Sequence, residues 1–207
     1  MERQLAHRAR LLDEGATAIG WKVAFGSPPA REPLGLSGPV VGFLTDVTRL
    51  PSGGECGVGE WTAPKLEPEI AIQIGEGGVI AGICAAIELA DADRPPAELE
   101  EVLAGDIYHR RVVLSGEEPV PLPDAPIAVA VTLDGEPLAG NEDAETATGR
   151  LTELVDHVAE HLASFGCELA PGEVVISGST VPLIDVAPGQ LIRSELAGIG
   201  AVEVALT

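Results

Sequence analysis

Length, composition and charge exclude several classes of protein. The 207 residues suffice for one domain with a substantial core, and the formal net charge of −21 argues against nucleic-acid and anionic-membrane partners. Aromatic residues are scarce and glycine and proline plentiful, so we expect many turns and an aliphatic core. Cys56, Cys84 and Cys167 form no CxxC pair, which supports neither a disulfide framework nor a thiolate zinc site.

The sequence shows no targeting or membrane-spanning signal. Residues 1–8 lack the apolar region of a signal peptide, and no run reaches the roughly 18 apolar residues of a transmembrane helix. We therefore expect a cytoplasmic enzyme or binding protein.

The first half of the chain predicts one helix followed mainly by strands. Leu5, Ala9 and Leu12 have the spacing of an amphipathic helix over residues 2–14, which Gly15 ends. The Gly/Pro-rich loop 26–39 is long for a compact domain, so we expect it to be functional. Residues 51–59 are turn-rich, and residues 75–78 read as a hairpin loop. We predict strands at 18–25, 40–44, 65–74 and 79–83.

The second half predicts more strands and one long helix. Pro95 and Pro96 suggest a helix over residues 93–103, and apolar spacing predicts another over 148–165, capped by Gly166. Asp134 and Gly135 predict a hairpin turn. Further strands are predicted at 112–114, 127–133, 174–177, 191–194 and 201–206. Many strands with one central helix indicate an α+β fold, largely antiparallel or mixed.

Three glutamates on predicted strands suggest a metal site. Glu67 and Glu69 lie two residues apart in a strand and point to one side, and Glu88 lies in another apolar run. Pro68 cannot donate a ladder hydrogen bond, so we place this segment at a sheet edge or bulge that a ligand can approach. The alternative is a solvated strand face that carries ordinary glutamates.

Lys22 is the second unusual residue. It lies in an apolar run, where its charge is costly to bury unless an acid pairs with it or its pKa falls. Either condition suits proton transfer beside a carbonyl group. The alternative is a lysine at a strand end whose ammonium reaches solvent.

Several motifs follow one another in an order that resembles a known family. They are GWKV at residues 20–23, GFLTD at 42–46, PKLEPEIA at 64–71, AIELAD at 86–91 and APGEVVISGS at 170–179. In this order they resemble the fumarylacetoacetate hydrolase superfamily, most closely its branch of 2-keto-4-pentenoate hydratases and 4-oxalocrotonate decarboxylases. The resemblance covers almost the whole chain.

The resemblance implies a fold, a cofactor and a chemistry. The fold would be a mixed β-sandwich roll forming a single catalytic domain over residues 1–207, of which residues 1–15 are a short helical extension. Mg²⁺ or Mn²⁺ would be held by Glu67, Glu69 and Glu88 and would polarise a small 2-oxo acid substrate. Lys22 would be catalytic, acting on the enolate. The family's place in aromatic catabolism and its assembly into homo-oligomers are implied as well.

The resemblance also implies substrate contacts. Ser179 and the backbone N–H groups at Gly178 would hold the substrate carboxylate, and Leu66 would contribute to the same pocket. Arg110 would bind a second carboxylate of a diacid, or else would pair with surface acids, which we favour.

Two departures from the branch leave the reaction open. Val40 stands where the branch usually has an acid, and residues 106–111 replace a small polar stretch with a bulky, basic one. Hydration is favoured over 4-oxalocrotonate-type decarboxylation and over C–C bond hydrolysis of the acylpyruvate or fumarylacetoacetate type. A non-catalytic homologue that binds metal and a dicarboxylate is the alternative of another class.

One further motif suggests a different enzyme. His157 and His161 with Glu160 match the H-x-x-E-H pattern of inverted zinc peptidases. The apolar stripe of the same helix runs beside these histidines, so we interpret the segment as an ordinary packing helix. It comprises Leu151, Leu154, Val155, Val158 and Leu162.

Overall fold

Two β-sheets form the framework of the protein in the computed structural model, which describes residues 1–116 and 118–207. The first sheet has the order β2-β1-β10-β5-β6-β7-β3, with β11 also paired to β5. Its strands are β1 (Ala18–Ala24), β2 (Val40–Thr45), β3 (Arg49–Pro51), β5 (Pro64–Ile74), β6 (Ile80–Asp91), β7 (His109–Leu114), β10 (Val174–Ile176) and β11 (Ile184–Asp185).

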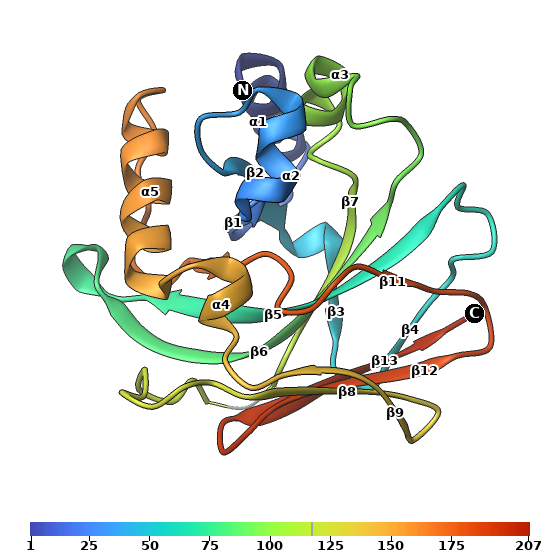
Figure 1. Ribbon diagram of the computed structural model, residues 1–207. Helices are drawn as coiled ribbons and strands as arrows, with labels where there is room; N and C mark the ends of the chain where they lie inside the picture. The colour runs from blue at the N-terminus through green and yellow to red at the C-terminus, as the bar shows by residue number, and fades with distance from the viewer. Residues whose placement is uncertain (117) are drawn as a thin grey trace.

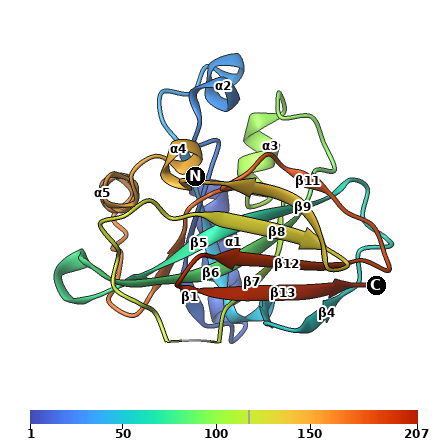
Figure 2. The ribbon, with the colours of Figure 1, turned by 60° about the horizontal axis from the view of Figure 1, so that its bottom comes forward.

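The second sheet has the order β4-β13-β12-β8-β9 and lies across β5 and β6 (Figure 2). Its strands are β4 (Gly54–Cys56), β8 (Val129–Leu133), β9 (Glu136–Asn141), β12 (Leu191–Leu196) and β13 (Gly200–Leu206). The helices are α1 (Glu2–Asp13), α2 (Pro28–Arg31), α3 (Leu99–Ala104), α4 (Glu145–Thr148) and α5 (Leu151–Ala163). Figure 1 shows α1, α2 and α3 on the side of the first sheet opposite the second sheet, which confirms the α+β sandwich roll. Among the described residues, no helix is long and apolar enough to cross a membrane.

The long hairpin of β5 and β6 separates the apolar core from the polar face. Large aliphatic side chains alternate along both strands, and Ile70, Ile72 and Ile87 are fully buried in the main core with residues of the second sheet. The residues between them point to the other face and are mostly small or acidic, because successive side chains of a strand alternate. One hairpin therefore contributes the centre of the core and a line of carboxylates behind it.

Most predicted elements are present, but some bounds differ. The helix predicted over residues 93–103 begins only at Leu99, because Pro95 and Pro96 disfavour helical backbone in the residues before them. The predicted loop 26–39 contains α2, and the turn-rich segment 51–59 contains β4. The long helix is interrupted at Gly149, whose φ is +82°, so α5 begins at Leu151. Asp134 and Gly135, both with positive φ, form the predicted turn between β8 and β9.

The expectation that Pro68 marks a sheet edge or bulge is wrong, since Pro68 pairs with Ile87 of β6 in a register that does not shift there. Strand β5 lies inside the first sheet, between β10 and β6. Its ladder with β10 ends at Ala71, and the loop of residues 177–183 fills the space beside Pro68 before β11 pairs with Leu66. Thr180 donates from its N–H and its hydroxyl to the Pro68 carbonyl, both at 2.8 Å. The missing donor of Pro68 is tolerated because a loop, not a strand, lies opposite it.

Candidate active site

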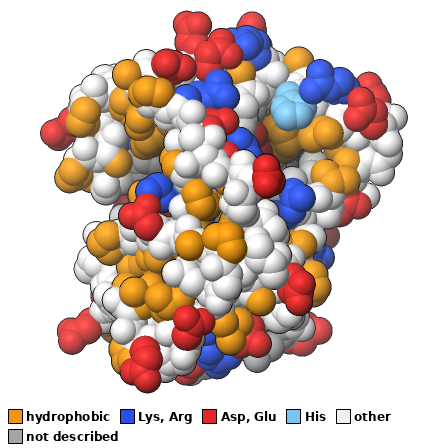
Figure 3. All heavy atoms as spheres, turned by 90° about the vertical axis from the view of Figure 1, so that its right-hand side faces the viewer, with side chains coloured by type: hydrophobic (Ala, Val, Ile, Leu, Met, Phe, Trp, Pro, Cys, Tyr) orange, Lys and Arg blue, Asp and Glu red, His pale blue; other side chains and the backbone are white. Residues whose placement is uncertain are grey.

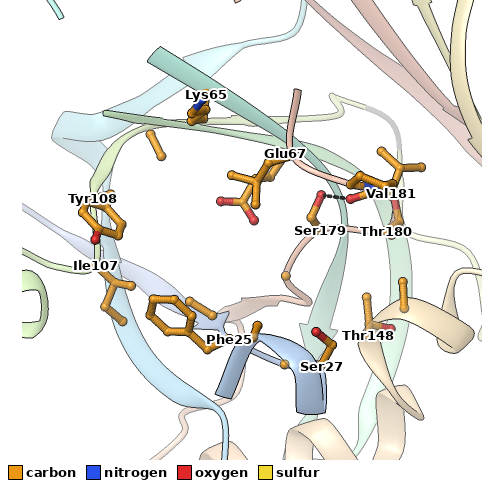
Figure 4. A pocket seen from close by; sticks show the side chains of 18 of the residues that line it. Phe25, Ser27, Lys65, Glu67, Ile107, Tyr108, Thr148, Ser179, Thr180 and Val181 are labelled. Atoms are coloured by element: carbon orange, nitrogen blue, oxygen red, sulfur yellow. Dashed lines mark hydrogen bonds between the residues drawn. The ribbon is translucent and has the colours of Figure 1, made fainter. Parts of the chain in front are cut away.

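The three predicted carboxylates share one face of the β5–β6 hairpin. Glu67 lies directly opposite Glu88 in the register, and Glu69 follows two residues later on the same side. Side chains directly opposite each other in such a pair have Cβ atoms about 5 Å apart. Glu69 and Glu88 are buried, whereas the carboxylate of Glu67 points into a cavity (Figure 4). Strand alternation and register thus place the predicted trio on one face of the hairpin.

Lys22 extends from β1 to these carboxylates. Its side chain is 1% exposed, its ammonium pairs with Glu88, and it donates to the Ile107 carbonyl at 3.1 Å. Gly42 lies opposite it on β2, and a Cβ there would be 2.6 Å from Lys22 Cγ and 2.8 Å from Asp106 Oδ1. Glycine at this position leaves the space through which the lysine passes.

The charges of Lys22 and Glu88 stabilise each other. Burial favours the neutral amine of Lys22, but the negative charges of Glu88, Glu67 and Asp106 outweigh it and raise the lysine pKa. Burial likewise opposes ionisation of Glu88, but Lys22 and His109 together hold the pKa of that carboxyl below its ordinary value. Lys22 is therefore a paired cation and not a neutral amine.

The other two carboxylates have the opposite shift. Burial and the charge of Glu88 raise the pKa of Glu67 to about 7. Burial and the charges of Glu88 and Glu67 raise the pKa of Glu69 well above its usual range. The N–H of Gly178 donates to Glu69 Oε2 at 2.8 Å, and the N–H of Ser179 favours ionisation of Glu67. Negative charge at this site is thus under-compensated.

The donor set fits a hard divalent cation. Glu69 Oε1 and Glu88 Oε2 are buried carboxylate oxygens without a hydrogen-bond partner, which is costly unless another group compensates them. Within residues 1–116 and 118–207, no three His, Cys, Asp or Glu side chains are already gathered as metal ligands. The Lys22 ammonium contacts Glu88 in this arrangement. Carboxylate oxygens are the ligands that Mg²⁺ and Mn²⁺ prefer, so the metal assignment of Glu67, Glu69 and Glu88 stays a prediction with chemical support.

His109 belongs to the site, although the sequence did not identify it. Its Nδ1 lies 2.8 Å from Glu88 Oε1 and its Nε2 lies 3.0 Å from the hydroxyl of Thr48. Ala90, two residues after Glu88 on β6, pairs with His109 on β7. This contact depends on the register between two strands, so the isolated histidine carried no local signal.

A left-handed turn precedes His109 and faces Lys22. Asp106, Ile107 and Tyr108 all have positive φ, at 59°, 54° and 65°, which is unfavourable for residues other than glycine. Asp106 Oδ1 accepts hydrogen bonds from the Phe43 N–H and from the amide of Gln4, both at 2.9 Å. The turn presents the Ile107 carbonyl to the lysine ammonium. Part of the bulky replacement noted in the sequence thus positions Lys22.

The predicted substrate-binding residues differ in whether they line the cavity and in the partners they contact. Ser179 and Gly178 line the cavity, but the Ser179 hydroxyl donates to the Val181 carbonyl at 2.7 Å and the Gly178 N–H is engaged by Glu69. Leu66 is fully buried between β6 and β11. Arg110 pairs with Asp93 at 3.2 Å and with Asp91 at 3.8 Å, which is the alternative that the sequence favoured.

A cavity of about 930 Å³ opens in front of Glu67 and Lys22. Loop 26–39 contributes to its wall, as expected for a functional loop, through Ser27, Ala30 and Leu34. Figure 4 shows Phe25, Ile107 and Tyr108 across the cavity from Glu67. Phe25 follows β1 directly and has a φ of +54°. This conformation is unfavourable for phenylalanine, and it places the aromatic ring at the cavity.

The other candidate positions are structural. His157 Nε2 lies 3.0 Å from the Pro39 carbonyl, and the rings of His157 and His161 stack at 6.1 Å. The five predicted apolar residues of α5 are its buried stripe, which supports the packing-helix interpretation. Val40 is buried with Val102 and Ile107 and supplies no polar group.

Comparisons with known proteins agree with this architecture. No family model matches the chain. The 2-hydroxyhexa-2,4-dienoate hydratase of Comamonas testosteroni is 26% identical over 97% of this chain and 83% of its own length. The 4-oxalocrotonate decarboxylase of Pseudomonas putida G7, solved with magnesium and adipate, superposes with a TM-score of 0.86 at 23% identity, covering 99% of this chain and 83% of that one. The fumarylpyruvate hydrolase of Pseudomonas aeruginosa, solved with Mn²⁺ and pyruvate, has a TM-score of 0.70 at 16% identity and covers 92% and 89%.

Proposed function

We infer that this protein is a divalent-metal-dependent lyase of 2-oxo acids. The inference rests on distant homology over the full chain to the hydratase and 4-oxalocrotonate decarboxylase branch of the fumarylacetoacetate hydrolase superfamily, to which the protein belongs. The reaction we propose is hydration of a substrate like 2-keto-4-pentenoate. The observation that carries the proposal is the buried Lys22 ammonium among three carboxylates beside a cavity.

The residues divide the chemistry between them. Glu67, Glu69 and Glu88 would hold Mg²⁺ or Mn²⁺, which supplies Lewis acidity toward the 2-oxo group. Lys22, a cation beside Glu88 in the metal-free protein, would supply positive charge beside the enolate and pass a proton to carbon; in the reverse direction the amine left behind would take a C3 proton. Ser179 lines the cavity and would orient the substrate carboxylate once its hydroxyl leaves the Val181 carbonyl.

Val40 favours one second candidate, decarboxylation. Hydration needs a group that orients the attacking water, and the buried Val40 side chain cannot do so. Loss of CO₂ from a second carboxyl group, conjugated with the 2-oxo group, leaves the electron pair in the same enolate and needs no such water. Hydration in this protein must depend on another polar group.

The test follows enolate formation directly. We expect Mg²⁺ or Mn²⁺ with pyruvate to raise the melting temperature, since a ligand selective for the native state stabilises it. The same mixture in D₂O should exchange the C3 protons of pyruvate, as read by proton NMR. Dienol absorbance, CO₂ release and acid liberation then separate hydration, decarboxylation and C–C hydrolysis.

Lys22→Met provides the decisive comparison. It keeps the length of the side chain and removes the charge, so exchange should fall at least about a hundredfold. Arg193→Met, an exposed change on β12, is the control for loss of one positive charge. Stabilisation without exchange in the wild type would contradict the enzyme and support a non-catalytic binding protein.

A further inference from the structure

The cavity is larger than a short 2-oxo acid needs. Its volume of about 930 Å³ lies near the top of the range of roughly 300–1,000 Å³ for pockets that bury drug-sized ligands. Glu67 and Lys22 line only part of it, so the remaining volume must accommodate the part of the substrate beyond the reacting carbons. The character of that volume therefore bears on substrate choice.

Apolar side chains from three separate segments form much of the remaining wall. Phe25 follows β1, Ala30 and Leu34 come from loop 26–39, and Val181 and Leu183 come from the loop beside Pro68. Leu183 is 58% exposed, which is unusual for a large aliphatic side chain and leaves its surface open to a ligand. Figure 4 shows Val181 and Phe25 on different sides of the same space.

The cations at this wall already have acidic partners. Besides Lys22, the basic side chains lining the cavity in the described part of the chain are Lys65 and Arg94. Lys65 pairs with Asp185, and Arg94 makes two contacts to Asp93 at 3.0 and 3.2 Å. A second carboxylate on the substrate would have to displace one of these acids, whereas an alkyl or aryl group would not.

We propose, on the basis of the proposed function, that this cavity selects monocarboxylic 2-oxo acids with an extended apolar tail over short ones and over dicarboxylic ones. Burial of each additional methylene in an apolar pocket strengthens binding several-fold. The tail occupies the wall formed by Phe25, Ala30, Leu34, Val181 and Leu183 while the 2-oxo acid end faces Glu67 and Lys22. This preference separates the protein from a decarboxylase of diacids.

The test compares C3 deuterium exchange on three acids with the same reacting group: 2-oxobutanoate, 2-oxooctanoate and 2-oxoadipate. With the Mg²⁺-loaded protein, we expect kcat/KM for 2-oxooctanoate to exceed that for 2-oxobutanoate at least about tenfold. 2-Oxoadipate should gain nothing over 2-oxobutanoate. Calorimetry supplies a readout apart from turnover, because the heat capacity change of binding should become more negative for 2-oxooctanoate.

Two substitutions, each with a matched control, test the location of the apolar wall. Ala30→Trp fills it, so the ratio of 2-oxooctanoate to 2-oxobutanoate exchange should collapse toward one. Pro29→Trp, exposed on the same short helix and outside the cavity lining, should keep the ratio. Leu183→Lys adds an unpaired cation and should raise 2-oxoadipate relative to 2-oxooctanoate at least about tenfold. Leu138→Lys makes the same change on β9, away from the cavity, and should not.

The outcomes separate this proposal from the proposed function. Exchange that is flat or falling with chain length, or a preference for 2-oxoadipate in the wild type, overturns the specificity proposal and leaves the lyase proposal intact. Absence of exchange on all three acids overturns both.

Discussion

Lys22 offsets negative charge that three glutamates bring to one face of the first sheet. It contacts Glu88 directly, and its charge also lowers the pKa values of Glu67 and Glu69 from what burial alone would produce. Breaking a buried ion pair by removing one partner is costly because the other charge stays buried without compensation. The lysine therefore matters to stability as well as to chemistry.

Lys22→Met should lower the free energy of unfolding of the metal-free protein by about 3–5 kcal/mol at pH 7.5. Urea denaturation in EDTA measures it. The matched control is Lys65→Met, since Lys65 pairs with the largely exposed Asp185 and its loss should cost less than about 1 kcal/mol. Equal effects of the two substitutions would contradict the importance assigned to the buried pair.

Glu67 should make the metal-free protein less stable as pH rises from about 4.5 to about 7. Its pKa is raised from 4.5 to about 7 in the folded state, so in this window the native protein binds more protons than the unfolded chain. The stabilisation is present at low pH and is lost as pH passes through the folded-state pKa. Allowing for the partial exposure of Glu67, we expect an effect on the order of 2 kcal/mol.

Urea denaturation in EDTA at a series of pH values checks this slope. Glu67→Gln cannot titrate and should reduce the slope, with the remainder coming from Glu69, whereas Glu195→Gln on the exposed face of β12 should leave it unchanged. A wild-type stability that increases across the same window would show that other groups dominate the titration.

At the scale of elements, the antiparallel pair of β1 and β2 makes the path for the lysine. Gly42 faces Lys22 across this pair, and the added Cβ of an alanine would overlap both Lys22 and the carboxylate of Asp106. Neither neighbour can move freely, because Asp106 is held by Phe43 and Gln4 and Lys22 by Glu88. The packing of two strands and a turn therefore fixes where the ammonium lies.

Gly42→Ala should lower the free energy of unfolding by about 1–3 kcal/mol. It should also reduce the rate of C3 exchange by more than the loss of folded protein accounts for. Urea denaturation and exchange on pyruvate measure the two losses. Gly116→Ala is the control, since among the described residues no atom beyond its chain neighbours lies within 4 Å of the Cβ position there. Full exchange activity in a stably folded Gly42→Ala protein would contradict the proposed path.

At the scale of the whole molecule, the charge of −21 should work against the folded state. Acidic side chains are spread over the surface, as one face shows in Figure 3, and folding brings them closer together. Their repulsion is long-range, so ionic strength should modulate stability more than any single surface pair does.

Raising NaCl from about 0.05 to 0.5 M should raise the melting temperature by several degrees, because the Debye length falls from roughly 14 to 4 Å. Scanning calorimetry in EDTA measures the shift. Choline chloride should give a similar rise if screening is responsible, whereas a rise with NaCl alone would indicate cation binding at specific carboxylates. A melting temperature that does not change with either salt would contradict the self-repulsion argument.

The sequence alone determined the fold class, most strands, the buried stripe of α5, and the shared face of Glu67 and Glu69. These follow from local rules, since alternation along a strand and periodicity along a helix need no distant partner. The residues alone also suggested Glu88 as a third acid and left Lys22 either paired with an acid or neutral. The family resemblance added the catalytic role of Lys22 and the substrate contacts of Ser179 and Gly178. The helix start near Pro95 and the position of Pro68 in the sheet were mispredicted. A proline in the sequence shows that a backbone N–H donor is missing, but it does not show which segment lies opposite.

Only the tertiary structure decided the neighbours of the site. The contact of His109 with Glu88 arises from the register of β6 and β7, and the role of Asp106 from a left-handed turn that packs against β2 and α1. The capture of Glu69 by the Gly178 N–H depends on a loop more than a hundred residues away in sequence. Such contacts join segments whose separation along the chain carries no periodic signal, so their geometry exists only once the sheets have closed.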